Sequence, residues 1–322
     1  MLRFVVRRFA LGVFVMWLVT LLVFAIFYLA GGPSTVARTL AGKNAQPQTV
    51  ALISHRLRLD QPRWYQYWYF LKQLVWHHDL GYSYQNNESV SHILGGAFPI
   101  TLSLAIGSAV IWIVLGVMTG VVSAVRRGSL LDRSFTTLAL FFYSFPTFVL
   151  GLLILDIFYY QFTVHGLHWF PGQYPITFPK SPVHFLQVFA LPWITLALVS
   201  AATYTRLTRS SLLEVLGEDY IRTARSKGLA ERRVIYRHGL RSALTPVASQ
   251  FGIDVGTLLG GAIITETVFG MPGLGFTAVR SIDRQDLPVI IGIVIVATAA
   301  VIIANIVVDI FYAVLDPRVR LH

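Results

Sequence analysis

The chain has 322 residues, of which 55% are hydrophobic and 13% are charged. These proportions are typical of a membrane protein, so contact with an anionic membrane leaflet explains the formal net charge of +11 better than nucleic acid does. The chain has no cysteine, which excludes disulfides, iron–sulfur clusters, cysteine zinc sites and thiol nucleophiles.

The N-terminal segment is basic and is followed by an apolar run from Phe9 to Ala30. This run is longer than the apolar core of a secretory signal and lacks a clear small-x-small cleavage site, so we interpret it as an uncleaved first membrane span. Five further segments reach the ~20 apolar residues that a membrane-crossing helix needs. The sequence therefore predicts an all-α integral membrane protein with six transmembrane helices, at 9–30, 99–125, 134–160, 187–206, 246–268 and 288–313.

Positive charge predicts the orientation of these spans, because Lys and Arg near span ends are retained in the cytoplasm. With the N-terminus inside, 17 of the 26 basic residues lie in inner segments and three lie in the short outer loops. We therefore expect a multi-pass protein of the plasma (inner) membrane with both termini cytoplasmic.

The predicted domain organisation follows from these spans. The parts are the first span with its basic cytoplasmic N-terminus at 1–30, an extracytoplasmic loop or cap at 31–96, one integral domain at 97–315 and a cytoplasmic tail at 316–322. The cap is rich in Trp and Tyr and contains a predicted helix near 62–76. Its aromatic residues are typical of an interfacial belt, and the alternative is a platform that meets an external partner protein.

The third span contains Pro146, which predicts a kink, and Asp156 lies beyond it with either a structural or a functional role. In the outer loop that follows, His165 and His168 have a spacing that occurs in metal sites. Metal sites of this kind also need cysteine or carboxylate ligands, and none is nearby in the sequence. We therefore expect no metal site.

The segment 207–245 between the fourth and fifth spans is strongly basic. It can form two short amphipathic helices that meet at Gly228, because glycine takes the left-handed conformation that ends a helix. Its small residues would let a partner protein approach the backbone, and its basic residues would pair with that partner's carboxylates. The residues concerned are Arg222, Thr223, Ala224, Arg225, Lys227, Gly228 and Leu229. The alternative is a solvated positive loop without a partner.

The fifth span is the least hydrophobic and has two distinct faces. Gly252, Gly256 and Gly260 form a ridge of small residues on which another helix can pack closely. The other face is polar and consists of Gln250, Asp254, Thr257, Gly261 and Thr265. An ionisable group at membrane depth is costly unless it faces a cavity or a partner, so this face is a candidate translocation path. The alternative is that Asp254 only accepts hydrogen bonds from a neighbouring helix.

Catalytic motifs are absent from the sequence. No Gly-x-x-x-x-Gly-Lys-Ser/Thr phosphate loop occurs, so the chain is not expected to bind or hydrolyse ATP by itself. No converging carboxylates or histidines suggest general acid–base chemistry. We therefore predict no catalytic, cofactor or metal residues, and no enzyme activity.

The basic segment also has a specific order of residues. The run from Arg222 to Gly228, followed by Arg237 to Pro246, resembles the cytoplasmic EAA-type loop of bacterial ABC importer permeases, and most of all the B subunits of the oligopeptide and dipeptide importers. Glu266 to Gly275, Asp309 to Arg318 and the opening Arg7-Arg8-Phe9 match as well. The resemblance covers essentially the whole chain.

This resemblance implies a type I ABC importer permease fold that moves peptides by alternating access. In that family the segment around Ala224 to Gly228 is a coupling helix held in a cleft of an ATPase, so Ala224 and Gly228 should tolerate bulk least. Two departures from the family pattern are Arg222, in place of a Glu, and Ala230, in place of a helix-capping Ser, which predicts a weaker cap for the second short helix.

The resemblance also implies partners. These are a homologous second permease, favoured as a heterodimer over a homodimer, an extracytoplasmic solute-binding protein, and two ABC ATPase subunits or one fused ATPase that hold ATP and magnesium. The transported solute stays open among dipeptides, oligopeptides, glutathione and nickel chelates. The competing interpretations are an ion-coupled secondary transporter, for which inverted repeats are expected, and an intramembrane enzyme.

Overall fold

The computed structural model describes residues 2–26, 37–38, 46–56, 58–59, 61–83, 85–171 and 181–315, without the side chains of 2–5, 56, 257, 259–261 and 311–315. It contains two compact units. The first consists of Met1–Ile100 and Pro272–Ile306, and the second of Thr101–Met271 and Val307–His322. Two long helices, α5 (Val90–Val125) and α14 (Leu287–Leu315), contribute residues to both units.

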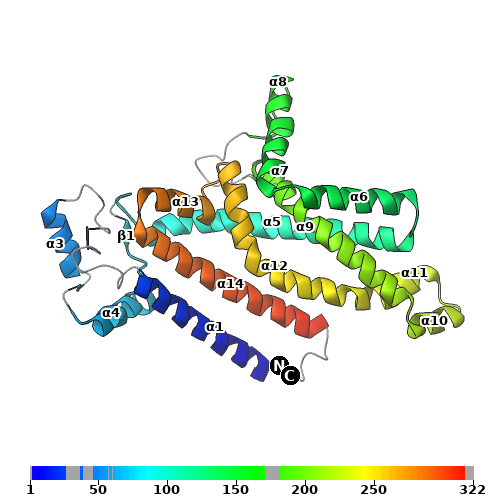
Figure 1. The fold of residues 1–322 in the computed structure, drawn as a ribbon, viewed down its shortest axis with the longest axis horizontal. Coiled ribbons are helices and arrows are strands. Elements are labelled where there is room, and N and C mark those ends of the chain that lie inside the picture. The colour runs from blue at the N-terminus through cyan, green and yellow to red at the C-terminus, as the bar shows by residue number, and fades with distance from the viewer. Residues whose placement is uncertain are drawn as a thin grey trace. The chain divides into compact units, whose positions relative to one another are not determined.

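In the first unit, α1 (Leu2–Phe24) lies along α14 (Figure 1). The Ile302 side chain packs directly on Gly12, because a Cβ atom at Gly12 would lie 2.7 Å from Cγ2 of Ile302. Apolar residues of α1 and α14 meet in a cluster around Val23 and Ile291. The unit's other elements are α3 (Pro47–Arg56), α4 (Arg63–Trp76), β1 (Tyr82–Ser83), β2 (Glu88–Ser89) and α13 (Leu274–Arg284).

The helix α4 confirms the helix predicted near 62–76. It packs on α1, where the Tyr67 hydroxyl lies 3.1 Å from Oγ1 of Thr20. The short antiparallel hairpin of β1 and β2 is held by Asp286, whose buried carboxylate accepts hydrogen bonds from Ser83 and Asn86. The predicted outer loop after the fifth span also contains a helix that the sequence analysis missed, α13.

In the second unit, α9 (Pro182–Leu216) lies among α5, α6 (Leu130–Ser144) and α12 (Leu240–Val268). A core around Trp112, Tyr204 and Val247 joins α5, α9 and α12. The remaining elements are α7 (Thr147–Ile154), the π-helix η2 (Leu155–Gln161), α8 (Phe162–Val164), α10 (Asp219–Ser226), α11 (Glu231–Arg233) and the π-helix η3 (Val234–Gly239).

Backbone contact brings α5 and α9 together at two glycines. A Cβ atom at Gly116 would lie 2.3 Å from Cβ of Tyr204, and one at Gly120 would lie 2.6 Å from Cβ of Thr208 and 2.8 Å from the Thr205 carbonyl oxygen. Gly116 and Gly120 are four residues apart, which is the spacing that lets helices approach at backbone distance. The Thr119 and Thr205 hydroxyls, 2.8 Å apart, add a polar contact between the same helices.

Five helices of the described part of the chain are long and apolar enough to cross a membrane. They are Val6–Phe24, Val90–Val125, Thr147–Val164, Pro182–Leu216 and Leu287–Ile310. Four of them coincide with the predicted first, second, fourth and sixth spans. The predicted fifth span lies in α12, a helix of 29 residues that includes several residues whose side chains are not described.

The third span was predicted wrongly as one helix over 134–160. The chain instead breaks between α6 and α7, where Phe145 is extended with φ −83° and ψ 130°. Pro146 explains the break, because proline disfavours a helical conformation in the residue before it and has no backbone N–H to donate. The membrane-length helix is Thr147–Val164, and it turns sharply away from α6 (Figure 1).

Candidate functional site

The basic loop, residues 217–230, joins α9 to α11 and consists mainly of α10. As predicted, it turns at Gly228, which has a φ of 73°. The cap before α11 is also weak as predicted, because Ala230 makes no side-chain capping hydrogen bond. The prediction of a separate second short helix is wrong, however. α11, η3 and α12 form one uninterrupted helical segment from Glu231 to Val268, so the predicted loop 207–245 is much shorter.

One side of α10 is buried against its own chain. Ile221 and Ala224 pack on Val234 of η3, with Val215 and Leu216 at the end of α9 completing the cluster. Ala224, one of the small residues predicted to let a partner approach the backbone, is itself only 8% exposed. Helix α10 sits on the ends of α9 and η3 as a fixed part of the second unit.

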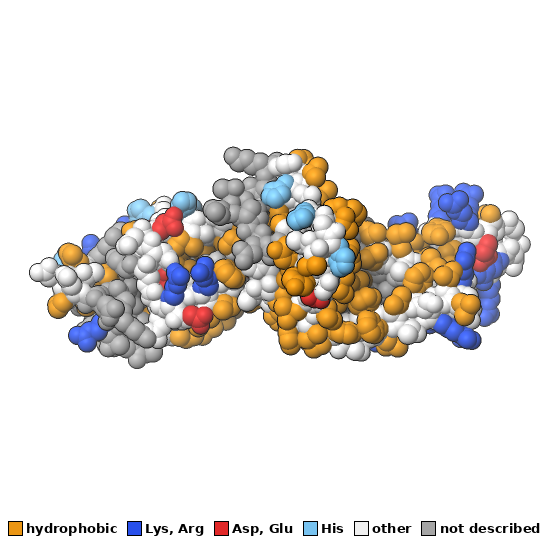
Figure 2. Space-filling model, turned by 90° about the horizontal axis from the view of Figure 1, so that it is seen from above, with side chains coloured by type: hydrophobic (Ala, Val, Ile, Leu, Met, Phe, Trp, Pro, Cys, Tyr) orange, Lys and Arg blue, Asp and Glu red, His pale blue; other side chains and the backbone are white. Residues whose placement is uncertain are grey.

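The other side of α10 is exposed and basic. Its exposed residues include Arg222, Thr223 and Arg225. In the turn that follows, Lys227 and Gly228 are exposed as well, whereas Leu229 is half-buried. A Cβ atom added at Gly228 would meet nothing within 4 Å in the described structure. Figure 2 shows Lys and Arg side chains gathered at the end of this unit that carries the basic loop.

Two of the basic side chains already have partners inside the loop. Arg225 forms a two-pronged ion pair with Glu231, at 2.8 and 3.1 Å, across the Gly228 turn, and Arg225 holds the pKa of Glu231 below its usual value. The Arg222 guanidinium lies 3.4 Å from the Asp219 carboxylate. Both pairs are solvent-exposed, so they orient the side chains more than they stabilise the fold.

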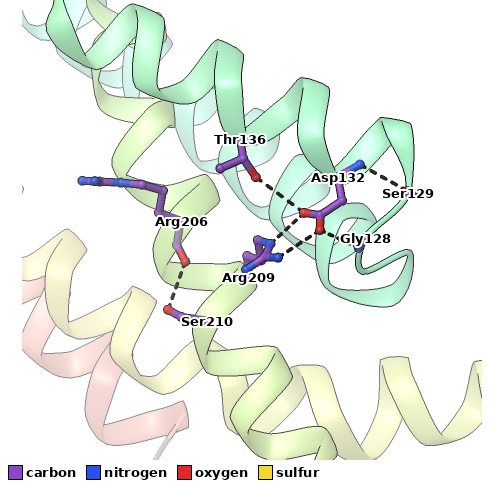
Figure 3. Close-up of polar contacts among 7 residues, drawn as sticks. All are labelled: Gly128, Ser129, Asp132, Thr136, Arg206, Arg209 and Ser210. Atoms are coloured by element: carbon purple, nitrogen blue, oxygen red, sulfur yellow. Dashed lines mark hydrogen bonds and ion pairs between the residues drawn. The ribbon is translucent and has the colours of Figure 1, made fainter.

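A second polar site lies where α6 begins, and the sequence analysis did not single it out. Asp132 points toward Arg209 of α9 (Figure 3) and accepts two hydrogen bonds from its guanidinium, at 2.7 and 2.9 Å. The backbone N–H of Gly128 donates to the same carboxylate at 2.9 Å. Ser129 caps α6 by accepting from the Asp132 N–H.

Burial makes the pair of Asp132 and Arg209 different from the loop pairs, because the Asp132 side chain is only 6% exposed and the Arg209 side chain 29% exposed. The Arg209 guanidinium, together with the Gly128 N–H, holds the pKa of the Asp132 carboxyl well below its usual range. The carboxylate therefore stays ionised in the folded protein. Removing one partner of such a pair leaves the other charge buried and unpaired.

The polar face of α12 is arranged around Asp254. The Tyr204 hydroxyl of α9 donates to Oδ2 of Asp254 at 2.8 Å, and the Gln250 amide donates to Oδ1 at 2.8 Å. This is the geometry of the structural alternative, in which Asp254 accepts hydrogen bonds from a neighbouring helix. Thr265, on the same predicted face, is 1% exposed. Thr257 and Gly261 belong to the part of α12 whose side chains the structure does not describe.

The glycine ridge predicted on α12 is only partly in contact. A Cβ atom at Gly252 would lie 3.2 Å from Cγ1 of Val308, whereas one at Gly256 would meet nothing within 4 Å of the described structure. Gly260 lies outside the residues whose side chains are described. Close backbone contact between helices is made at Gly116 and Gly120 of α5 instead. The Gly-x-x-x-Gly spacing of these two residues in the sequence could have predicted this contact.

Glu266 is a further buried carboxylate that the sequence analysis quoted only as part of a motif. It is fully buried near the end of α12 and accepts a hydrogen bond of 2.6 Å from the Thr101 hydroxyl of α5. Its position in an apolar helix could have predicted a buried contact of this kind, because a charged group at membrane depth needs a partner.

The contact of Tyr204 with Asp254 leads to a stability prediction. Tyr204→Phe removes the donor while keeping the ring, so Asp254 loses one of its hydrogen bonds, and we expect a loss of about 1–3 kcal/mol in the free energy of unfolding. Thermal unfolding of the detergent-solubilised protein measures this. Tyr143→Phe is the control, because Tyr143 is 53% exposed and contributes its ring face to Arg206. Equal unfolding temperatures for the two variants would contradict the prediction.

Comparison with known proteins places this architecture in a family. The profile described as "Binding-protein-dependent transport system inner membrane component" matches residues 113–321, and the profile for the N-terminal part of such components matches residues 1–105. The chain belongs to this family of transport permeases. It is therefore a multi-pass inner-membrane subunit of an ABC importer that works with a solute-binding protein and an ATPase, and the interpretations as a secondary transporter or an intramembrane enzyme are wrong.

Relatives match the permease over its whole length. The glutathione transport system permease protein GsiC of Escherichia coli O6:H1 is 36% identical over 320 residues, and the di/tripeptide transport system permease protein DppB of Pseudomonas aeruginosa is 38% identical over 341 residues. A GsiC protein of Shigella dysenteriae serotype 1 is 36% identical over 320 residues. Each alignment covers 99% of both chains.

Proposed function

We propose that this permease moves short peptides inward across the inner membrane, with α10 of the basic loop as the coupling helix that receives the motion of the ATPase. The substrate class is supported by the relatives, which are named for di- and tripeptides and for glutathione, itself a tripeptide. The observation that carries the coupling role is the two-sided construction of α10, which is packed on its own chain by Ile221 and Ala224 and exposes a basic surface on the other side.

The orientation and the number of spans belong to the same proposal. Six membrane helices, with α12 as the fifth and α7 to α8 as the third, place both termini and the basic loop in the cytoplasm. Support comes from the concentration of Lys and Arg in those segments, since basic residues near span ends are retained there. Residues 31–96 then form an extracytoplasmic cap, 97–315 the permease domain and 316–322 the cytoplasmic tail.

The proposed mechanism is alternating access driven from outside the chain. ATP and magnesium bind to two ATPase subunits, or to one fused ATPase, and closure of the ATPase pushes on α10. Because α10 is packed against the ends of α9 and η3, this push moves the long helices and opens the permease outward. ATP hydrolysis returns the helices to the inward-open state.

The second half of the translocation path would come from a homologous permease, proposed as a heterodimer partner. In this chain the path follows the polar face of α12 at Gln250 and Asp254. The hydrogen bonds of Tyr204 and Gln250 to Asp254 support a polar wall that is fixed before substrate arrives. Such a wall suits a peptide, whose backbone and charged ends need hydrogen-bonding groups.

The test is purification of the solubilised permease from its native membrane, followed by identification of the bound subunits and reconstitution into liposomes. We expect an ATPase, a second permease and a solute-binding protein, and ATP-dependent uptake of labelled dipeptides, tripeptides or glutathione. A complex that contains an ATPase but accumulates none of these solutes would overturn the peptide assignment. A permease that purifies without an ATPase would overturn the coupling role.

A further inference from the structure

The contact between Asp132 and Arg209 connects two regions that are far apart in sequence. The residues are 77 positions apart, unlike the local pairs of the basic loop. Asp132 lies in the first turn of α6, and Arg209 lies seven residues before the end of α9. Since α9 leads into α10 after two residues, Arg209 is on the helix that supports the basic loop.

The two ends of this ion pair are anchored differently. Asp132 is held within its own segment by the Gly128 N–H and by the start of helix α6, where a negative charge is favoured by the helix dipole. Arg209 depends on Asp132 for its position, because the guanidinium donates through both Nε and an Nη to that one carboxylate. A displacement of α9 at Arg209 is therefore transmitted to the start of α6.

Helix α9 makes other contacts, and one of them also reaches α6, because the exposed Arg206 stacks on the Tyr143 ring at 4.8 Å. Gly116 and Gly120 attach α9 to α5, and Tyr204 attaches it to α12. After the break at Pro146, α6 is followed by the membrane-length helix Thr147–Val164, which consists of α7, η2 and α8 and has Asp156 exposed on η2. A two-pronged ion pair is directional, whereas apolar contacts between α6 and α9 would allow sliding.

We propose that the ion pair of Asp132 and Arg209 is a positioning contact that transmits motion of the coupling helix from α9 to α6, and through α6 to α7. This inference rests on the proposed function of α10. Each of the two residues acts through the geometry of the helix that it holds.

The experiment uses the complete importer, purified and reconstituted in liposomes of Escherichia coli polar lipids, with Arg209→Met and Asp132→Asn in this chain. We expect both variants to keep the ATPase subunits and their basal ATP hydrolysis. Stimulation of hydrolysis by the solute-binding protein should fall roughly tenfold, within the range of allosteric couplings. Arg206→Gln is the matched control, because it removes the same charge one turn away on α9, from a side chain that points away from Asp132 (Figure 3). This side chain is exposed, and it contacts α6 by stacking on the Tyr143 ring at 4.8 Å, without an ion pair.

A distance measurement distinguishes a loss of transmitted motion between α9 and α6 from a loss of folding stability. Because the chain has no cysteine, spin labels can be attached at Leu130→Cys on α6 and Glu214→Cys on α9, which are both exposed, in a complex whose other subunits lack cysteine. In the otherwise unchanged chain we expect the distance between the labels to be the same without nucleotide and after vanadate trapping with ATP. In Arg209→Met we expect it to shift or broaden on trapping.

The double substitution Asp132→Asn with Arg209→Gln completes the test. It replaces two charges by a neutral pair that can still hydrogen bond, so we expect coupling to recover relative to either single variant. The proposal is overturned if the single variants keep full stimulation, or if hydrolysis and yield fall in proportion while the label distance stays unchanged. Loss of the ATPase from the unsubstituted complex would instead contradict the coupling role of α10, and the ion-pair proposal would fall with it.

Discussion

Gly120→Leu is expected to reduce the amount of folded permease in the membrane roughly tenfold or more, because overpacking costs of a few kcal/mol correspond to such factors. The physical reason is the backbone contact between α5 and α9. The Cβ atom alone would lie 2.8 Å from the Thr205 carbonyl oxygen and 2.6 Å from Cβ of Thr208, and neither atom belongs to a flexible side-chain end. The two helices must separate, which also breaks the contact between Thr119 and Thr205.

The matched control for this prediction is Gly96→Leu on the same helix, where a Cβ atom would meet nothing within 4 Å of the described structure. Leucine has a higher helix propensity than glycine, so the intrinsic helical stability of α5 increases in both variants. Membrane yield and detergent size-exclusion profiles measure the effect. If both variants accumulated like the unsubstituted protein, close packing at Gly120 would not be required for folding.

Gly228→Trp is expected to abolish binding of the ATPase while leaving the permease folded. Inside the chain there is room for the side chain, because a Cβ atom at Gly228 would meet nothing within 4 Å of the described residues. The Trp side chain would therefore clash with a protein that docks on α10, and not with the permease itself. The left-handed φ of 73° adds a strain of about 1–2 kcal/mol for a residue with a Cβ atom.

Two controls separate bulk from backbone strain in this second prediction. Gly228→Asn keeps a residue that tolerates the left-handed conformation, and it should retain the ATPase. Gly166→Trp adds the same bulk at another open glycine with a φ of 83°, in the proposed outer segment, and it should also retain the ATPase. Copurification of the ATPase with each variant is the measurement. Equal recovery with Gly228→Trp would remove α10 as the docking surface.

Local patterns accounted for much of the fold. The helix of α4, the turn at Gly228 and the weak cap at Ala230 were predictable because each depends on neighbouring residues. Pro146 was predicted to kink one helix, whereas in the structure it separates two helices, α6 and α7. A proline removes one hydrogen bond and disfavours helix in the residue before it, yet packing around the break decides how far the chain turns.

The candidate site was only partly predictable for a related reason. The exposed basic residues of α10 were identified correctly as exposed, but the sequence could not tell that Ala224 faces inward, because a helix of eight residues has few positions from which to assign its buried side. The continuity of α11, η3 and α12 was hidden by a polar, basic composition that is also typical of a loop.

By itself, the sequence determined that this is a membrane protein, because apolar length and charge distribution are additive properties that need no knowledge of contacts. Membership in the permease family was indicated by residue order in the motifs, which also needs no knowledge of contacts. Tertiary structure alone decided that Asp132 meets Arg209 across 77 positions, that Gly116 and Gly120 bring α5 against α9, and that Tyr204 and Gln250 hold Asp254. Each of these contacts depends on which helices become neighbours and at which rotation, and a single sequence specifies that only through the packing of the whole unit.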